Sequence, residues 1–191
     1  MPILILASKS PRRVALLKKE GLKFKILPAN IEEKSRFKRP KNLVADLARQ
    51  KASFVADKNP ENPVLAADTV VYVKGRILGK PANKSDALRL LRLQNGRKQT
   101  VFTGVCLIWK EKGINLCETA KSFCYARKLS EKELKKLAGK HLDKAGAYAV
   151  QDKSDDFIEK IEGDFDNVVG LPMRIVRKLL KKIKYTLEEK W

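Results

Sequence analysis

The ten residues 64–73, which read Val-Leu-Ala-Ala-Asp-Thr-Val-Val-Tyr-Val, constrain the fold more than any other segment. Apolar side chains occupy both phases of this run, which is typical of a strand buried on both faces in the middle of a sheet. Helix-like and strand-like segments alternate along the chain, and a hairpin joins two long strands at 100–109 and 114–129. This pattern predicts an α/β protein with a mixed, twisted sheet flanked by helices.

Asp68 stands in the middle of the apolar run. An ionised carboxylate in such a place is costly to desolvate unless a cation or hydrogen-bond donors compensate it. Two interpretations are open: a structural aspartate bonded to backbone amides, or a functional carboxylate that positions a metal or deprotonates water. Thr69 has the opposite phase on the strand and would reach a ligand only through a bulge or at a strand end.

A short apolar strand at residues 3–7 leads directly into a helix that starts at Ser10-Pro11. The free backbone N–H groups of a helix start favour anions. Four polar side chains at this junction could converge with them on an oxyanion such as phosphate: Ser8, Ser10, Arg12 and Arg13. The alternative is an ordinary helix start with solvated arginines.

Two lysines are candidates for anion binding. Lys51 falls in the apolar stripe of a helix expected at 42–56, so its ammonium either reaches the surface or points into a cavity that receives an anion. Lys80 lies between Gly79 and Pro81, where the backbone would present it at a defined place; the alternative is an ordinary loop lysine.

Glu33 and Gln151 are the remaining candidates. Glu33 and its neighbour Glu32 follow an edge strand expected at 22–27; such pairs are usually solvated, but carboxylates can hold a hard divalent cation. Gln151 ends a run of small residues around one tyrosine, and its amide offers the donor and acceptor needed to read the edge of a nucleobase.

Length and composition indicate a single domain over residues 1–191, because 43% hydrophobic residues suffice for one core. No apolar run approaches the roughly 20 residues of a membrane span, and nothing resembles a signal peptide, so we expect a cytoplasmic protein. The three cysteines have no Cys-x-x-Cys spacing, which favours reduced structural thiols over a disulfide or a zinc site: Cys106, Cys117 and Cys124.

The formal net charge of +20 raises the question of nucleic-acid or membrane binding. The basic residues are spread along the whole chain, with local concentrations only at 34–41 and 174–184. In the second segment the cations lie opposite an apolar helical register, which favours a solvated face. Nucleic acid is therefore not the expected partner, although polyanionic substrates would be attracted.

Five sequence blocks together resemble the Maf family of nucleoside triphosphate pyrophosphatases. The first block is Ser8-Lys9-Ser10-Pro11-Arg12-Arg13. The others follow in order: Glu32-Glu33; Ala66-Ala67-Asp68-Thr69-Val70-Val71 leading to Gly79-Lys80-Pro81; Lys144-Ala145-Gly146-Ala147-Tyr148-Ala149-Val150-Gln151; and Asn167-Val168-Val169-Gly170-Leu171-Pro172. One departure is visible, because Lys140-His141 stands where the family commonly has Glu-Pro.

The resemblance implies a two-lobed, inosine-triphosphatase-like architecture with a central cleft, and hydrolysis of a nucleoside triphosphate to the monophosphate and pyrophosphate. It assigns the phosphate charge to Arg12, Arg13, Lys51 and Lys80, with Ser8 and Ser10 steadying the phosphate loop. Glu33 and Asp68 would hold Mg²⁺ or Mn²⁺, and Asp68 would also accept a proton. Arg12, Thr69 and Gln151 match the subgroup that acts on dTTP and UTP rather than 7-methyl-GTP.

A different class of function stays open at this point. A basic nucleic-acid-binding or cell-division regulatory protein could keep a vestigial nucleotide pocket. We rank it second because simple backbone binding does not require acidic groups beside the cations. A homodimer is also left open by the sequence.

Overall fold

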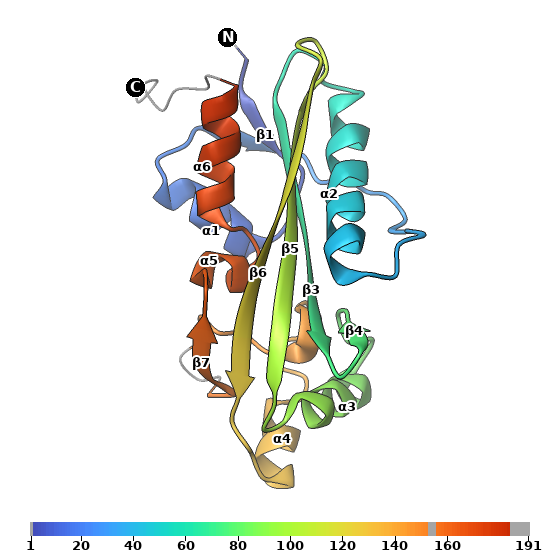
Figure 1. The fold of residues 1–191 in the computed structure, drawn as a ribbon, viewed down its shortest axis with the longest axis vertical. Coiled ribbons are helices and arrows are strands. Elements are labelled where there is room, and N and C mark those ends of the chain that lie inside the picture. The colour runs from blue at the N-terminus through green and yellow to red at the C-terminus, as the bar shows by residue number, and fades with distance from the viewer. Residues whose placement is uncertain (1, 153–155, 184–191) are drawn as a thin grey trace. The chain divides into compact units, whose positions relative to one another are not determined.

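The computed structural model describes residues 2–152 and 156–183 (Figure 1). Its elements are, in order, β1 (Leu4–Leu6), α1 (Pro11–Lys19), β2 (Phe24–Ile26), α2 (Pro40–Ala56), β3 (Val64–Val73), β4 (Arg76–Leu78), α3 (Lys84–Gln94), β5 (Lys98–Trp109), β6 (Ile114–Ala126), α4 (Glu131–Leu137), a short 3-10 helix (Ala145–Ala147), β7 (Ile158–Glu162), α5 (Phe165–Val169) and α6 (Met173–Lys182). No helix in these described ranges is long and apolar enough to cross a membrane.

The strands form one seven-stranded sheet in the order β2-β1-β3-β5-β6-β7, and β4 pairs separately with β3. β1 runs parallel to both β2 and β3, whereas the β3–β4 and β6–β7 pairs are antiparallel. The sheet is therefore mixed, β3 is internal and β2 lies at an edge, as the sequence predicts. β7 and α5 have no counterpart in the sequence-based predictions.

The chain forms two compact units. Unit 1 comprises the described residues of 1–68, 103–120 and 170–191, and unit 2 those of 69–102 and 121–169. Because β3, β5 and β6 are long, each contributes residues to both units.

In unit 1 the apolar residues of β1 and β3 are divided between two cores by the alternation of a strand. Leu4, Leu6 and Leu65 belong to the core that includes the apolar faces of α1 and α6. Ile5 and Ala66 belong to the core that includes α2. Both faces of these strands are thus covered by helices, which explains why their sequences are continuously apolar.

The backbone of α2 packs directly on β5 at Gly104. A Cβ atom built at Gly104 would lie 2.3 Å from the carbonyl oxygen of Val44 and 2.7 Å from the amide nitrogen of Ala45. No real side chain fits at such distances, so glycine at this position permits the close approach of helix and strand.

Unit 2 has a core of its own. Apolar side chains of α3, α4 and the strands surround the fully buried Phe157, whose ring lies 5.9 Å from that of Tyr148. Ser130 starts α4 with a capping box, in which its hydroxyl accepts from Glu133 N–H and the Glu133 carboxylate accepts from Ser130 N–H.

The expectation of reduced cysteines is wrong for one pair, because Cys106 in β5 and Cys117 in β6 form a disulfide. Cys124 is a buried free thiol. The hairpin explains the pairing: the two cysteines are equally far from Trp109 and Ile114, the residues at the turn, so they face each other across neighbouring strands. Spacing rules for zinc and redox motifs do not detect such a cross-strand pair.

Candidate active site

Seven of the ten predicted site residues belong to unit 1: Ser8, Ser10, Arg12, Arg13, Glu33, Lys51 and Asp68. The parallel pairing of β1 with β3 explains part of this grouping. The Ala7 N–H donates to the Leu65 carbonyl oxygen at 2.8 Å. The chain that leaves β1 at Ser8 therefore runs beside the part of β3 that continues to Asp68.

Arg13 joins three segments that are distant in the sequence. Its Nε donates to the carbonyl oxygen of Gly170 at 2.9 Å, and its Nη1 donates to that of Ala67 at 2.7 Å. The same Nη1 lies 3.3 Å from Ser8 Oγ, which also accepts from the Ser10 N–H at 3.2 Å. A planar guanidinium with several fixed donors is suited to such a task, and it fixes the turn after β1 against β3.

The charges around Arg13 act on its protonation in opposite directions. Burial lowers the pKa of Arg13 from its ordinary value; the negative charge of Asp68 opposes this, Arg12 lowers it further and Glu33 raises it. Even a lowered arginine pKa leaves the guanidinium protonated near neutral pH. Two cations and two carboxylates thus influence one another within unit 1.

Asp68 is buried and contacts the ammonium of Lys51, with Oδ1 2.5 Å from Nζ. The two side chains are only 10% and 11% exposed. Asp68 shares the pleat phase of Ala66, which packs in the core that includes α2, and Lys51 projects from α2. Strand alternation and the helical stripe therefore direct the two groups toward each other.

Lys51 also contacts Glu33, whose Oε1 lies 3.0 Å from Nζ. The Glu33 side chain is 48% exposed, so this second carboxylate connects the buried pair to solvent. Gln50, the neighbour of Lys51 on α2, donates to the carbonyl oxygen of Lys34 at 2.9 Å and so holds the loop that carries Glu33 against the helix. One ammonium thus bridges two carboxylates.

Asp68 and Glu33 offer carboxylate oxygens of the kind that divalent cations such as Mg²⁺ prefer. In residues 2–152 and 156–183 no group of three or more His, Cys, Asp and Glu side chains could hold a metal. Mg²⁺ is usually held by only one or two protein carboxylates together with water and substrate phosphate oxygens. Asp68 and Glu33, both within reach of one cation position, fit a site of that kind.

The other three predicted residues belong to unit 2: Thr69, Lys80 and Gln151. Lys80 and Gln151 are exposed, and Thr69 is half-buried. Within this unit a hydrogen bond joins the segment Gly79-Lys80-Pro81 to the segment 144–151: the Gly146 N–H donates to the Gly79 carbonyl oxygen at 3.1 Å.

Gln94 supports this junction and was not among the predicted residues. Its side-chain amide, fully buried, donates to the carbonyl oxygens of Gly146 at 2.7 Å and Leu90 at 2.8 Å. Gly146 has φ +77°, and a Cβ there would lie 2.8 Å from Gln94 Oε1, so this position requires glycine. A polar residue at the buried end of α3 is the only sequence signal that could have identified Gln94.

Comparison with known proteins decides the family. A model of the family described as Maf-like protein matches residues 3–183. The chain belongs to the Maf family. A Maf relative named dTTP/UTP pyrophosphatase in Elusimicrobium minutum is 51% identical over 182 residues, which cover 95% of this chain and 99% of that protein. A protein of the same name in Caldicellulosiruptor saccharolyticus is 39% identical over 194 residues, covering 98% of each chain.

One solved structure supports the fold of this Maf chain. The Ham1 protein of Staphylococcus aureus has a TM-score of 0.51 and is 12% identical, with 95% of this chain and 97% of that chain covered. At this identity the likeness concerns the fold only. It agrees with the mixed α/β architecture predicted from the sequence.

Proposed function

We propose that this chain is a nucleoside triphosphate pyrophosphatase that hydrolyses dTTP and UTP to the monophosphate and pyrophosphate. One observation carries the proposal: the buried Asp68 carboxylate contacts Lys51 beside the turn that Arg13 holds in place. A buried acid with a buried cation costs free energy to desolvate, and such groups concentrate at functional sites. The names of the Maf relatives supply the substrate class.

In the proposed reaction a water molecule attacks the α-phosphorus and pyrophosphate leaves. Asp68 accepts the proton of that water, since a carboxylate within hydrogen-bonding reach can serve as a general base. Lys51, Arg12 and Lys80 are the cations that we assign to the phosphate oxygens. Phosphoryl transfer depends mainly on such positioning and charge neutralisation, because the protein performs little covalent chemistry.

A divalent cation is part of this proposal. Asp68 and Glu33 would hold Mg²⁺ or Mn²⁺, which would supply charge neutralisation at the phosphates. Lys51 contacts both carboxylates, so its ammonium and a metal ion would compete for the same negative charge. With those carboxylates occupied by a cation, the ammonium of Lys51 would be available to the substrate phosphates.

Ser8, Ser10 and Arg13 form the turn that would receive the phosphates. Every hydrogen bond described above for Arg13 goes to a protein oxygen, so we assign it a second task beside the predicted phosphate contact, namely to hold this turn in position. Recognition of the pyrimidine base falls to Arg12, Thr69 and Gln151, and the amide of Gln151 has both the donor and the acceptor that uracil or thymine requires.

Pyrophosphate release from a panel of triphosphates tests the function. We expect dTTP and UTP to be hydrolysed fastest, with a monophosphate and pyrophosphate as products and with a requirement for Mg²⁺ or Mn²⁺. Equal or faster hydrolysis of GTP or 7-methyl-GTP would contradict the substrate class. Full turnover in the presence of a strong chelator would contradict the metal requirement but not the proposed hydrolysis.

A further inference from the structure

We propose that the Cys106–Cys117 disulfide is a thiol-exchange site, that an external thiol acts on it at Cys117, and that its redox state alters the packing of α2. This site lies outside the proposed catalytic residues. Only the turnover measurement described below rests on the proposed function, because thiol exchange is measured on the protein itself.

The two sulfur atoms differ in access. Cys106 is fully buried, whereas Cys117 is half-exposed on the neighbouring strand. Thiol–disulfide exchange requires a thiolate to reach one sulfur of the disulfide, and access helps to decide which sulfur is attacked. An incoming thiol therefore meets Cys117 Sγ first.

The proposed exchange takes place in two steps, in each of which a thiolate attacks a sulfur atom. The thiolate of a small thiol such as glutathione attacks Cys117 Sγ and forms a mixed disulfide. The bond between the two cysteines breaks, and its electron pair leaves on Cys106, which takes a proton from water. A second thiolate then attacks the glutathione sulfur, releases Cys117 as a thiolate and forms oxidised glutathione. Oxidised glutathione drives the reverse reaction.

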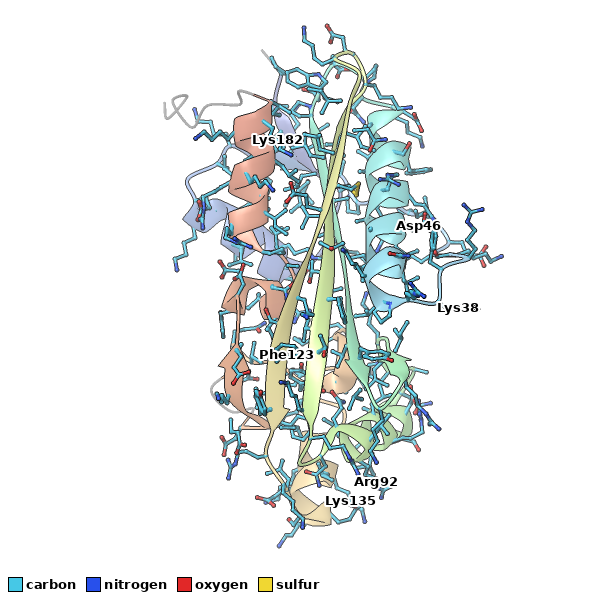
Figure 2. The ribbon with its side chains drawn as sticks, viewed as in Figure 1. Lys38, Asp46, Arg92, Phe123, Lys135 and Lys182 are labelled. Atoms are coloured by element: carbon cyan, nitrogen blue, oxygen red, sulfur yellow. A yellow bond between two sulfur atoms is a disulfide. The ribbon has the colours of Figure 1, made fainter. Side chains whose placement is uncertain are left out.

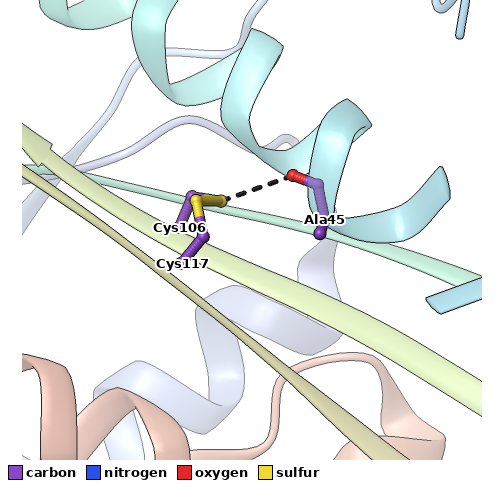
Figure 3. Close-up of a disulfide and its surroundings, with 3 residues drawn as sticks. All are labelled: Ala45, Cys106 and Cys117. Carbon is purple, nitrogen blue, oxygen red and sulfur yellow. Dashed lines mark hydrogen bonds between the residues drawn. A yellow bond between two sulfur atoms is a disulfide. The ribbon is translucent and has the colours of Figure 1, made fainter. Parts of the chain in front are cut away.

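Cys106 connects this exchange to α2. Its Sγ lies 3.5 Å from the carbonyl oxygen of Ala45 (Figure 3). In the disulfide the sulfur carries no proton, so it cannot donate to that oxygen, whereas the reduced thiol can. Reduction also breaks the S–S bond, so the two sulfur atoms move apart to a non-bonded distance and Cys106 presses on α2. We therefore expect the packing of α2 on β5 to loosen, although the thiol gains a weak donor.

The contact of Cys106 with Ala45 lies on α2, the helix that also carries Lys51 of the candidate active site. Ala48 and Ala52 of α2 pack in one core with Cys106, and Lys51 lies between them in the sequence. At Gly104, two residues before Cys106, the backbones of β5 and α2 already touch, which leaves no space to absorb a shift. A change at Cys106 is thus expected to reach the helix that positions Lys51.

Cys124 provides a matched control in the same chain. It is buried, and burial raises the pKa of its thiol to about 11. A thiol that stays protonated and buried is a poor nucleophile and a poor target for alkylation. We expect the folded protein to leave Cys124 unmodified in either redox state.

The first experiment follows the exchange on the full chain purified without reductant. The protein is incubated with reduced glutathione, quenched with acid, alkylated and mapped by mass spectrometry. We expect a glutathione adduct on Cys117, none on Cys106 and none on Cys124, and the same pattern in Cys124→Ser. Adducts on Cys106, or exchange that starts only when denaturant is added, would overturn the proposed site.

The second experiment tests the coupling to α2. Backbone amide hydrogen exchange is measured over α2 in the oxidised wild type, in the same protein reduced with dithiothreitol, and in Cys117→Ser. We expect exchange in α2 to be several-fold faster in the reduced protein and in the variant. Equal or slower exchange in the reduced wild type would overturn the coupling, whether or not the variant folds.

Turnover of dTTP in the two redox states completes the test. We expect a several-fold lower rate in the reduced protein, because Lys51 is then less firmly positioned. Equal rates in an active enzyme would overturn the effect on the active site. If neither state releases pyrophosphate, the proposed function fails, and the exchange and α2 measurements still decide the disulfide proposal.

Discussion

Two three-residue clusters of lysines and carboxylates among the described residues of unit 1 are opposite in composition. In the first, Lys51 contacts two acids, Asp68 and Glu33. In the second, Glu118 of β6 contacts two cations of α6, Lys178 at 2.9 Å and Lys182 at 3.4 Å (Figure 2 labels Lys182). The first cluster therefore has an excess of negative charge and the second an excess of positive charge.

The two clusters differ in how far their charged side chains are exposed to solvent. The side chains of Lys51 and Asp68 are 11% and 10% exposed, whereas those of Lys178 and Lys182 are 58% and 49% exposed. Water and salt neutralise the outer cluster at little cost. In the inner cluster the buried pair is screened much less, and the surplus carboxylate, Glu33, is 48% exposed, so an additional cation can reach it from solvent. The buried cluster is therefore the candidate for chemistry, and the exposed one is a surface contact.

The largest expected effect comes from replacing Asp68 by Asn. This change keeps the shape of the side chain but removes its charge and its basicity. We expect pyrophosphate release to fall by about 10²- to 10⁴-fold, the range typical of losing a general base. The measurement is steady-state turnover of dTTP, with circular dichroism to establish that the variant is folded.

Asp57→Asn is a matched control for that variant. Asp57 follows α2 and contacts Lys110 on the surface, where its side chain is 54% exposed. We expect its turnover to equal that of the wild type. An unchanged turnover of dTTP in Asp68→Asn would mean that the buried cluster takes no more part in the chemistry than the exposed one.

Replacing Lys51 by Met tests the energetics of the buried cluster. The variant leaves the buried Asp68 carboxylate without its ammonium, and breaking a buried ion pair in this way destabilises proteins by about 3–5 kcal/mol. Because Glu33 is half-exposed, we expect a loss near the lower end of that range. Urea unfolding measures it.

The double variant Lys51→Met with Asp68→Asn sharpens this prediction. Removing the charge of Asp68 as well should restore most of the lost stability, since the two residues are in contact and their effects should not add. A double variant that is less stable than Lys51→Met alone would show that the charge of Asp68 is not what the lysine compensates.

A smaller effect is expected for Arg13→Lys. Lysine keeps the positive charge but cannot donate at once to Gly170, Ala67 and Ser8 as the guanidinium does. We expect a loss of about 1.5–3 kcal/mol in unfolding free energy, the size of one hydrogen bond to a charged group. Thermal and urea unfolding report it, and turnover should fall because the turn after β1 is no longer fixed.

Arg92→Lys is the control for Arg13→Lys, because it measures what replacing an arginine by lysine costs at an exposed ion pair. Arg92 is exposed in unit 2 and bonds to Glu131 across the surface, with Nε donating at 3.1 Å. Exposed pairs contribute little, so we expect nearly wild-type stability. Equal losses of unfolding free energy in Arg13→Lys and Arg92→Lys would mean that the hydrogen bonds of Arg13 to backbone carbonyls add no stability beyond that of an exposed ion pair.

The parts of the site that depend on local periodicity could be predicted from the sequence. Strand alternation predicts the face of Asp68, and the helical stripe predicts the inward direction of Lys51. Their mutual contact follows once both faces are known. The role of Arg13 could not be obtained in this way, because its partner Gly170 lies 157 positions further along the chain and accepts through a backbone carbonyl that has no sequence signature.

The disulfide shows a different kind of limit. Its pairing follows from the register of the hairpin, and the sequence predicts both strands that contain Cys106 and Cys117. The expectation of reduced thiols rested instead on the absence of a Cys-x-x-Cys spacing. That spacing says nothing about cysteines that face each other across the two strands of a hairpin.

The smallest effect is expected for Glu118→Gln in the exposed cluster, at about 0.2–1 kcal/mol of unfolding free energy near neutral pH. The hydrogen bond from Lys178 holds the pKa of Glu118 below its ordinary value, and Lys182 lowers it further while burial opposes both. A carboxyl with a lower pKa in the folded state stabilises the protein above its unfolded pKa, and this stabilisation disappears as the pH falls through the folded pKa. The difference between wild type and variant should therefore be present at pH 7, vanish in acid and shrink in 1 M NaCl, where screening is strong. If the difference in unfolding free energy persisted in acid or in high salt, Glu118 would stabilise the protein through packing and not through its charge. Solvent screening would then not explain why the Glu118 cluster differs from the Lys51 cluster.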